Sequence, residues 1–235
     1  MVVDAADAAE ERMGMTLRGT GPHAGQPVIQ AGAALESARS AMILVHGRGD
    51  SASGILQLAD ALPLRGMAYL APQASGNTWY PNRFLAPIPS NEPWLSSALA
   101  GLGDLTSQLQ AAGVPAADIV LLGFSQGACL ALEFAVRNPR KYGALVGLSG
   151  GLIGPPGTVW PQTGSLDGTP VFLGCSDVDP HIPAWRVDES ADVLREMGGD
   201  VTAVLYPGMD HTVTDEEARE VRRLIEPLGR GDGVG

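Results

Sequence analysis

Short apolar runs alternate with longer amphipathic segments along this chain. The short runs place Val, Ile and Leu at consecutive positions, which is typical of strands buried on both faces of a sheet. We predict strands at residues 42–45, 67–71, 118–122, 144–148, 171–173 and 201–206. The longer segments repeat apolar residues three and four positions apart, so we predict helices at residues 51–62, 94–113, 126–137, 184–197 and 214–228.

This alternation predicts the fold class. Strands connected through helices form a mostly parallel sheet with helices on both faces, so we predict an α/β fold of that kind. Residues 16–40 are interpreted as an antiparallel edge hairpin. Only about 20 residues separate the fourth and fifth predicted strands, which leaves no room for a large cap domain. We see no linker and predict one domain at residues 16–228, between a flexible segment, 1–15, and a flexible tail, 229–235.

Charge and hydropathy argue against several classes of function. The net charge is −11, and Lys141 is the single lysine among the 15 basic residues, so no basic stripe exists and we expect no nucleic-acid partner. No apolar run approaches the roughly 18 residues of a membrane helix, so we expect no stable membrane insertion. The first residues lack the positive start and apolar run of a secretory signal, and we therefore expect a cytoplasmic protein.

The sequence also offers little for a metal or a cofactor. Cys129 and Cys175 are too few for a disulfide framework and lie among apolar residues, so we predict two buried thiols. The familiar metal-ligand spacings, the P-loop and the G-x-G-x-x-G pattern do not occur. We therefore expect no metal and no cofactor.

Two serines lie in the pattern G-x-S-x-G, which is typical of a nucleophile elbow between a strand and a helix. Ser125, in GFSQG, follows a predicted strand and precedes a predicted helix. Ser149, in GLSGG, also follows a strand, but the glycines and prolines after it exclude a helix. We predict Ser125 as the nucleophile and a tight strand end for Ser149.

A serine hydroxyl needs a base, and on folds with this elbow the acid and the histidine follow the serine along the chain. His23 and His46 precede Ser125, and His46 is interpreted as a structural ring near the site. His211 lies between the last strand and the last helix and is the predicted base. His181 is the alternative, although a rim position fits it better.

The loop after the fifth predicted strand supplies the acid that orients the histidine. Asp179 is our prediction, and Asp177 is the alternative. An oxyanion hole needs backbone N–H groups, which we predict from Gln126, after the nucleophile, and from Arg48, in the loop HGRGD. The Arg48 side chain either pairs a substrate carboxylate or is solvated.

Four motifs taken together resemble one known family. HGRGD at 46–50, GFSQG at 123–127, SDVDPHIP at 176–183 and GMDH at 208–211 are similar to the phospholipase/carboxylesterase family of α/β-hydrolases, which includes acyl-protein thioesterases. The resemblance covers residues 40–228. It implies Ser125, Asp179 and His211 as the triad, backbone donors at Arg48 and Gln126, no large cap, no cofactor, and a homodimer as one option, since many members are dimers.

The chain departs from the family at two positions of these motifs. Many members have a small aliphatic residue where Arg48 stands and a second glycine where Ala128 stands. These differences concern the choice of substrate rather than the reaction.

We predict a serine carboxylesterase that hydrolyses small or medium-chain carboxylic esters through an acyl-enzyme intermediate. An acyl-thioesterase or a lysophospholipase with the same triad is the main alternative. A dienelactone-hydrolase-like enzyme, which usually carries cysteine at the elbow, and a non-catalytic ligand receptor are weaker ones. The predicted substrate pocket consists of apolar residues in the neighbouring loops: Trp79, Tyr80, Phe84, Leu85, Ile88, Leu152, Ile153, Trp160, Ile182 and Met209.

Overall fold

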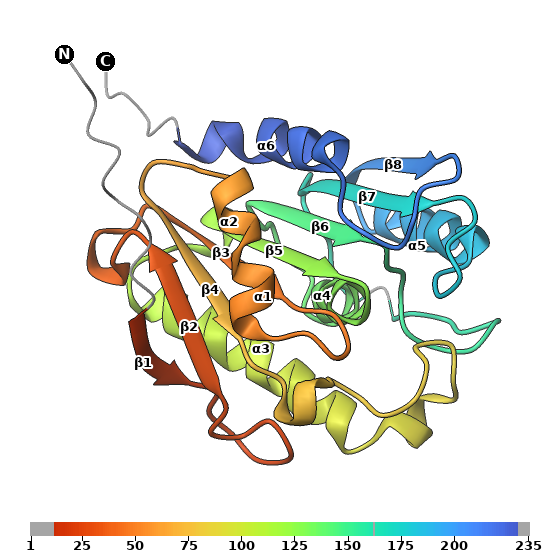
Figure 1. Ribbon diagram of the computed structural model, residues 1–235, viewed down its shortest axis with the longest axis horizontal. Coiled ribbons are helices and arrows are strands. Elements are labelled where there is room, and N and C mark those ends of the chain that lie inside the picture. Colours follow the sequence, from red (N-terminus) through yellow and green to blue (C-terminus); the bar gives the residue numbers. More distant parts are fainter. Residues whose placement is uncertain (1–11, 162, 230–235) are drawn as a thin grey trace.

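The computed structural model describes residues 12–161 and 163–229, and within them eight strands form one sheet (Figure 1). The strand order is β1-β2-β4-β3-β5-β6-β7-β8. The strands are β1 (Arg12–Thr16), β2 (Pro27–Gly32), β3 (Ser40–Val45), β4 (Met67–Pro72), β5 (Ile119–Phe124), β6 (Ala144–Leu148), β7 (Pro170–Ser176) and β8 (Asp200–Tyr206). All pairs from β4 to β8 are parallel, whereas β1 and β2 add an antiparallel edge.

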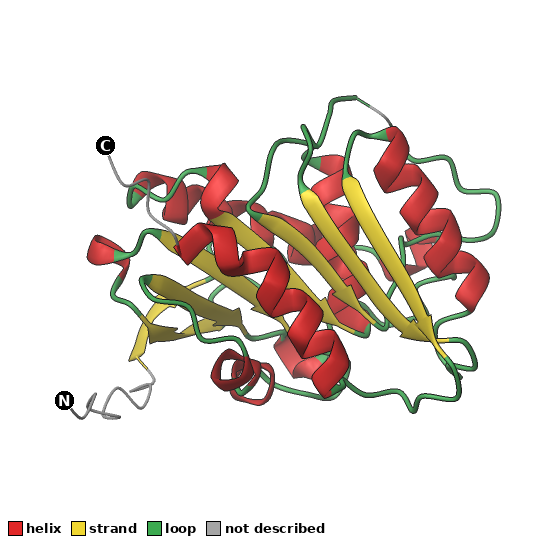
Figure 2. Ribbon diagram, turned by 90° about the horizontal axis from the view of Figure 1, so that it is seen from above, coloured by secondary structure: helices red, strands yellow, loops and turns green. Residues whose placement is uncertain are grey.

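Helices cover both faces of the sheet, and in the view from above they lie in front of the strands and behind them (Figure 2). They are α1 (Ala52–Leu56), α2 (Leu58–Ala61), α3 (Trp94–Ala111), α4 (Gln126–Arg137), α5 (Ala184–Glu196) and α6 (Asp215–Gly229). Helices α3, α4 and α5 pack on one face and α1, α2 and α6 on the other. The mostly parallel sheet with helices on both faces confirms the predicted fold class.

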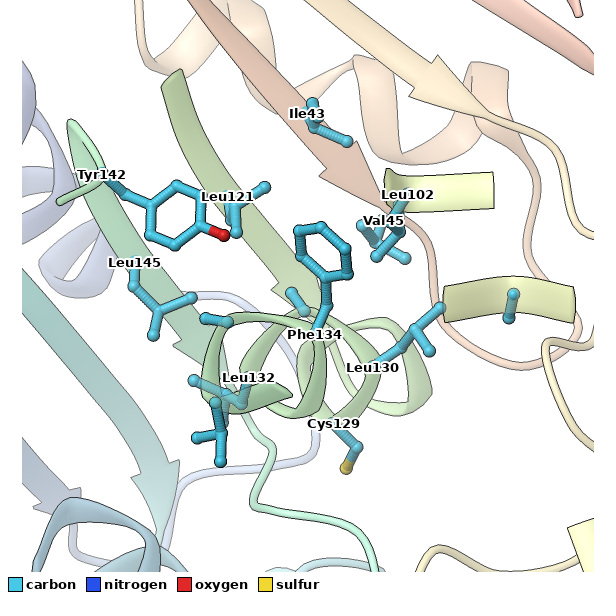
Figure 3. Packing of buried hydrophobic residues seen from close by; sticks show 14 of the residues in the cluster. Ile43, Val45, Leu102, Leu121, Cys129, Leu130, Leu132, Phe134, Tyr142 and Leu145 are labelled. Carbon is cyan, nitrogen blue, oxygen red and sulfur yellow. The ribbon is translucent and has the colours of Figure 1, made fainter. Parts of the chain in front are cut away.

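Alternate side chains of the central strands divide between two buried clusters, because successive residues of a strand point to opposite faces. Ile43 of β3 joins the cluster under α3, α4 and α5, and Met42 joins the cluster under α1 and α6. In Figure 3 the ring of Phe134 rises from α4 among Val45 and Leu121, which belong to the same cluster. The elbow therefore lies between two elements that are buried almost throughout.

Several predicted boundaries need correction. Residues 12–15, which we expected in a flexible segment, belong to β1, so the edge hairpin consists of β1 and β2 and begins earlier than predicted. Gly229, expected in the tail, ends α6. The predicted helix at 51–62 is two short helices, α1 and α2. Residues 1–11 and 230–235 lie outside the described residues.

The direction of the parallel strands positions the candidate motifs. β3, β5, β7 and β8 all run the same way, so the loops after them emerge at one edge of the sheet. These loops carry residues 46–50, 125, 177–183 and 207–213. Between β6 and β7 the described residues include no helix, which agrees with the absence of a large cap. None of the helices in the described ranges combines the length and apolar character of a bilayer-spanning helix.

Candidate active site

Ser125 occupies the sharp turn between β5 and α4. Its backbone has φ 53° and ψ −118°, a region that residues with side chains rarely adopt. The flanking glycines are required by close backbone contacts: a Cβ on Gly123 would overlap the backbone of Gly127, and a Cβ on Gly127 would overlap the backbone of Val45. The N–H of Ser125 donates to the carbonyl of Leu148, 2.9 Å away, which holds the turn against β6.

Ser125, His211 and Asp179 come from three separate loops and form one chain of hydrogen bonds. Ser125 Oγ lies 2.9 Å from His211 Nε2, and His211 Nδ1 lies 2.6 Å from Asp179 Oδ2. A proton on Nδ1, donated to the carboxylate, leaves Nε2 free to accept the proton of the serine hydroxyl. This is the geometry that a base-activated serine requires.

The Asp179 carboxylate is fully buried but well supplied with donors. Its Oδ1 accepts hydrogen bonds from the backbone N–H groups of His181 and Ile182, at 2.8 and 2.9 Å. Burial by itself raises the pKa of this carboxyl, but the hydrogen bonds from His211 and the two N–H groups outweigh it and hold the pKa below its ordinary value. Asp179 is therefore ionised at neutral pH and can stabilise an imidazolium at His211.

Asp177, the alternative acid, has a different role. Its Oδ1 accepts a hydrogen bond from the backbone N–H of Gly208, 2.8 Å away, so it joins the loop after β7 to the loop after β8. Asp177 is exposed, and the structure gives it no hydrogen bond to His211 among the described residues. The structure brings Asp179, and not Asp177, to the histidine.

Two backbone N–H groups beside Ser125 are free to bind an oxyanion. In the described part of the chain, the N–H groups of Arg48 and Gln126 donate to no acceptor. Both residues line the same cavity as Ser125. They are the two positions expected from the motifs, and the structure gives their N–H groups no other role.

The side chains of Gln126 and Arg48 fix the loop after β4. Gln126 Oε1 accepts from the N–H of Trp79 at 2.9 Å, and its Nε2 donates to the carbonyl of Tyr80 at 2.8 Å. The Arg48 guanidinium donates to the carbonyls of Tyr80, Pro81 and Asn82 at 2.7 to 3.0 Å. Three of the five guanidinium N–H donors of Arg48 are therefore engaged by this loop while the residue stays exposed, so it anchors the loop at the surface and is not merely solvated. Pairing with a substrate carboxylate stays a prediction.

His46 is a structural ring, as predicted. It is buried, its Nδ1 donates to the carbonyl of Gly47 at 2.7 Å, and its Nε2 accepts from the N–H of Ala74 at 3.1 Å. Burial lowers its pKa, so the neutral form is favoured. The indole N–H of Trp79 donates to the His46 carbonyl at 2.9 Å, which ties the loops after β3 and β4 together.

His181 and Ser149 lie close to the site without joining the hydrogen-bonded chain. The His181 ring contacts the His211 ring edge to face, with 4.9 Å between their centroids, so it is a rim residue and not the base that pairs with Ser125. Ser149 has φ 49°, and its buried hydroxyl has no hydrogen-bond partner in the described residues. It is followed by no helix, in agreement with a tight strand end.

A cavity of about 600 Å³ opens beside Ser125. Of the ten apolar residues predicted for the pocket, Tyr80, Phe84 and Ile182 line it. The other seven do not line this cavity: Trp79, Leu85, Ile88, Leu152, Ile153, Trp160 and Met209. Four of these seven, namely Trp79, Leu152, Ile153 and Trp160, are buried in the core instead.

Buried polar groups explain part of this correction. The carboxylate of Glu133 in α4 accepts hydrogen bonds from the N–H of Ile153 and from the indole N–H of Trp160, both at 3.1 Å. These bonds pull the loop after β6 onto the core. A glutamate inside an apolar helix face is the one sequence signal that pointed to such an anchor.

Sequence reasoning missed several cavity residues. Asp50, Pro81, Asn82, Arg83, Phe124 and Cys129 also line the cavity. Phe124 and Asp50 belong to the motifs GFSQG and HGRGD, so the motif context could have found them. Arg83 was missed because the predicted pocket consisted of apolar side chains alone.

The described residues include no group of three or more histidine, cysteine or acidic side chains that could hold a metal ion. Cys129 and Cys175 are free and buried, which confirms the prediction of buried thiols. Burial raises the pKa of each thiol to about 12, so neither is a reactive thiolate at neutral pH.

Comparisons with known proteins agree on one family. The family model for phospholipases and carboxylesterases matches residues 24–228. Acyl-protein thioesterase 1 of Debaryomyces hansenii is 27% identical over 232 residues, which cover 86% of this chain and 97% of that protein. Its counterpart in Saccharomyces cerevisiae is 28% identical over 220 residues, which cover 84% and 96%. The crystal structure of a phospholipase/carboxylesterase from Dyadobacter fermentans is 42% identical, covers 85% of this chain and 95% of that one, and has a TM-score of 0.82.

Proposed function

This chain belongs to the phospholipase/carboxylesterase family of α/β-hydrolases, and we propose that it is a serine carboxylesterase for small or medium-chain esters. Its family and its relatives are hydrolases of ester or thioester bonds, so this chain is a hydrolase of the same reaction class. The observation that carries the finer proposal is the hydrogen-bonded chain Ser125–His211–Asp179, with contacts of 2.9 and 2.6 Å, at the wall of an accessible cavity.

In the first half of the proposed reaction, His211 Nε2 takes the proton of Ser125 as Oγ attacks the ester carbonyl carbon. The carbonyl oxygen becomes negatively charged and accepts hydrogen bonds from the N–H groups of Arg48 and Gln126. Losing one such donor costs on the order of 3 kcal/mol of activation free energy. The bond to the alcohol then breaks, His211 protonates the leaving oxygen, and the acyl group remains on Ser125.

The second half reverses these roles with water. His211 takes a proton from a water molecule, whose oxygen attacks the acyl carbonyl. The bond between the acyl carbon and Ser125 Oγ breaks, and the proton returns to the serine. Asp179 stays ionised throughout and stabilises the imidazolium in both halves. No cofactor is needed, because acids, bases and N–H donors supply every step.

A direct test uses two measurements on the purified chain. A fluorophosphonate probe should label the native protein at Ser125 and leave Ser125→Ala unlabelled. A series of p-nitrophenyl esters from acetate to palmitate should give a kcat/KM maximum among the short and medium chains, because the cavity of about 600 Å³ is partly walled by Tyr80, Phe84 and Ile182. An unlabelled native protein that hydrolyses none of these esters refutes the proposal.

A thioesterase is the second candidate, because both yeast relatives are acyl-protein thioesterases and this chain matches nearly their whole length. The same serine chemistry cleaves thioesters, since only the leaving group differs. Matched pairs of acyl-CoA or acyl-N-acetylcysteamine thioesters and p-nitrophenyl esters with the same acyl group separate the two. A higher kcat/KM for the thioester of each pair would assign the chain to thioesters.

A further inference from the structure

The cavity beside Ser125 contains a cation that the protein itself leaves unpaired. Arg83 lines this cavity and is exposed, and across residues 12–161 and 163–229 its guanidinium has no hydrogen-bond or ion-pair partner. Arg48, the other arginine of the wall, has three guanidinium N–H donors engaged by the carbonyls of Tyr80, Pro81 and Asn82. The two arginines therefore differ, since Arg48 holds the loop and Arg83 is presented by it.

The backbone that presents Arg83 is anchored on both sides. Asn91 is fully buried, and its amide accepts from the N–H of Asn82 at 2.8 Å and donates to the carbonyl of Arg83 at 3.3 Å. The carbonyl of Phe84 accepts from the N–H of Gly154 at 2.8 Å. Because the donor and the acceptor of this buried amide both bind the short segment 82–83, the backbone of Arg83 is held beside the cavity.

The charge of the cavity differs from the charge of the chain. The whole sequence carries −11, yet the cavity wall has two arginines, Arg48 and Arg83, against one carboxylate, Asp50. An alkyl ester offers the guanidinium of Arg83 no hydrogen-bond partner, whereas an anionic group forms a charge-assisted hydrogen bond with it.

We propose that Arg83 determines specificity by pairing with a second, anionic group on the substrate, so that the preferred substrate is an ester that also carries a carboxylate. This inference rests on the proposed esterase function. The carboxylate can come from the acid, as in a half-ester of a dicarboxylic acid, or from the alcohol. Both sources offer Arg83 the same planar partner for its fork of N–H donors.

Matched substrate pairs test the inference. The acid arm compares p-nitrophenyl hexanoate with mono-p-nitrophenyl adipate, and includes the shorter succinate and longer suberate half-esters. The alcohol arm compares phenyl acetate with 4-carboxyphenyl acetate. We expect the charged ester to have a kcat/KM about tenfold higher than its neutral counterpart in at least one arm, mainly through a lower KM. This preference should shrink as salt is added, because an ion pair at an exposed arginine is screened.

Three variants assign the preference to Arg83. Arg83→Gln should abolish it by bringing the kcat/KM of the charged ester down to that of its neutral counterpart, and Arg83→Lys should retain part of it. Arg140→Gln removes the same charge from an exposed position outside the cavity wall and should retain it in full. Equal melting temperatures of the variants exclude a folding defect.

The outcomes separate this inference from the esterase proposal. If neutral esters are hydrolysed but neither charged ester is preferred, the role of Arg83 is refuted and the esterase stands. A preference that survives Arg83→Gln also refutes it. If the native chain hydrolyses no ester and takes no fluorophosphonate, the esterase proposal itself fails.

Discussion

Ser125 has a backbone conformation that costs a residue with a side chain on the order of 1–3 kcal/mol. The surrounding contacts hold it there, through the hydrogen bond to Leu148 and the close approach of the backbone at Gly123 and Gly127. This conformation directs the Ser125 hydroxyl away from β5 and α4 and into the cavity. The candidate nucleophile is therefore a position where stability has been given up for reactivity.

Substitutions at Ser125 should separate these two properties. We expect both Ser125→Ala and Ser125→Gly to abolish ester hydrolysis, because neither offers a hydroxyl. Ser125→Gly should be more stable than Ser125→Ala by about 1 kcal/mol, since glycine adopts a positive φ without strain. Urea unfolding of both variants measures the difference. A less stable glycine variant would show that the turn is not strained, and near-native turnover of either variant would remove Ser125 from the reaction.

The two aspartates of the loop after β7 form a matched pair. Asp179→Asn should lower kcat by about 10⁴-fold, because an amide cannot stabilise the imidazolium of His211 and disturbs its tautomer. Asp177→Asn keeps an oxygen that can accept from Gly208 and should leave kcat within a few-fold of the native value. Steady-state kinetics on one p-nitrophenyl ester decide the matter, and a severe loss in Asp177→Asn alone would reverse our assignment.

At the scale of elements, the site is built from loops that are tied to one another rather than to the sheet alone. The neutral ring of His46 joins the loop after β3 to the loop after β4 through the N–H of Ala74, and Gln126 at the start of α4 holds the same loop through Trp79. The oxyanion donors at Arg48 and Gln126 thus depend on contacts between segments far apart in the sequence.

The tie through His46 predicts a pH dependence of stability. Burial places its folded pKa below the ordinary 6.5, so the unfolded chain takes up a proton first as the pH falls. The stability that native His46 contributes is complete above pH 6.5 and decreases below it. We therefore expect the difference in unfolding free energy between the native chain and His46→Gln to shrink from about pH 7.5 to about pH 5.5.

Taking this difference removes the contributions of groups that do not interact with His46, such as the buried Glu133 and Glu217, whose pKa values burial raises. The buried His23, whose pKa burial also lowers, repels a protonated His46 and is therefore part of the measured difference. Unfolding in urea at several pH values supplies the data. A difference that stays constant, or that grows as the pH falls, contradicts the role given to His46.

The long elements were the easiest to predict. The helices α3, α4 and α5 follow the expected ranges closely, because apolar periodicity over ten or more residues reports directly which face is buried. The strands of the sheet's centre were recognised from continuous apolar runs, because both of their faces are buried. The segment 51–62 was harder, since a short amphipathic stretch does not show that the helix is interrupted at Gln57, between α1 and α2. β1 carries too few apolar residues to be recognised and gains its structure by pairing with β2.

At the scale of the whole molecule, one sheet and two buried clusters run through the described residues. Each cluster extends from the antiparallel edge near β2 to the helices beside β7. We propose on this ground that the chain folds as a single domain, with ordered structure over a slightly wider range than residues 16–228. The absence of a nucleic-acid partner, the cytoplasmic location and the homodimer remain predictions.

The single-domain proposal has a calorimetric test. Thermal unfolding should show one transition with a calorimetric enthalpy equal to the van't Hoff enthalpy, because no boundary divides the clusters. The midpoint should be the same when followed by circular dichroism and by tryptophan fluorescence, since Trp79 and Trp160 are buried in the core. Two separate transitions, or midpoints that differ between the probes, would require a second cooperative unit.

The sequence by itself determined the fold class, the elbow at Ser125 and the pairing of that serine with His211. These are local or sequential properties, because periodicity reveals buried faces and the order of the loops along parallel strands brings them to one edge. Only the tertiary structure decided between Asp177 and Asp179 and placed four of the expected pocket residues in the core. It also showed that Arg48 anchors a loop, whereas Arg83 lines the cavity. Side chains on loops take their direction from partners dozens of residues away, such as Gln126 for Trp79 and Arg48 for Asn82, and no local pattern encodes those partners.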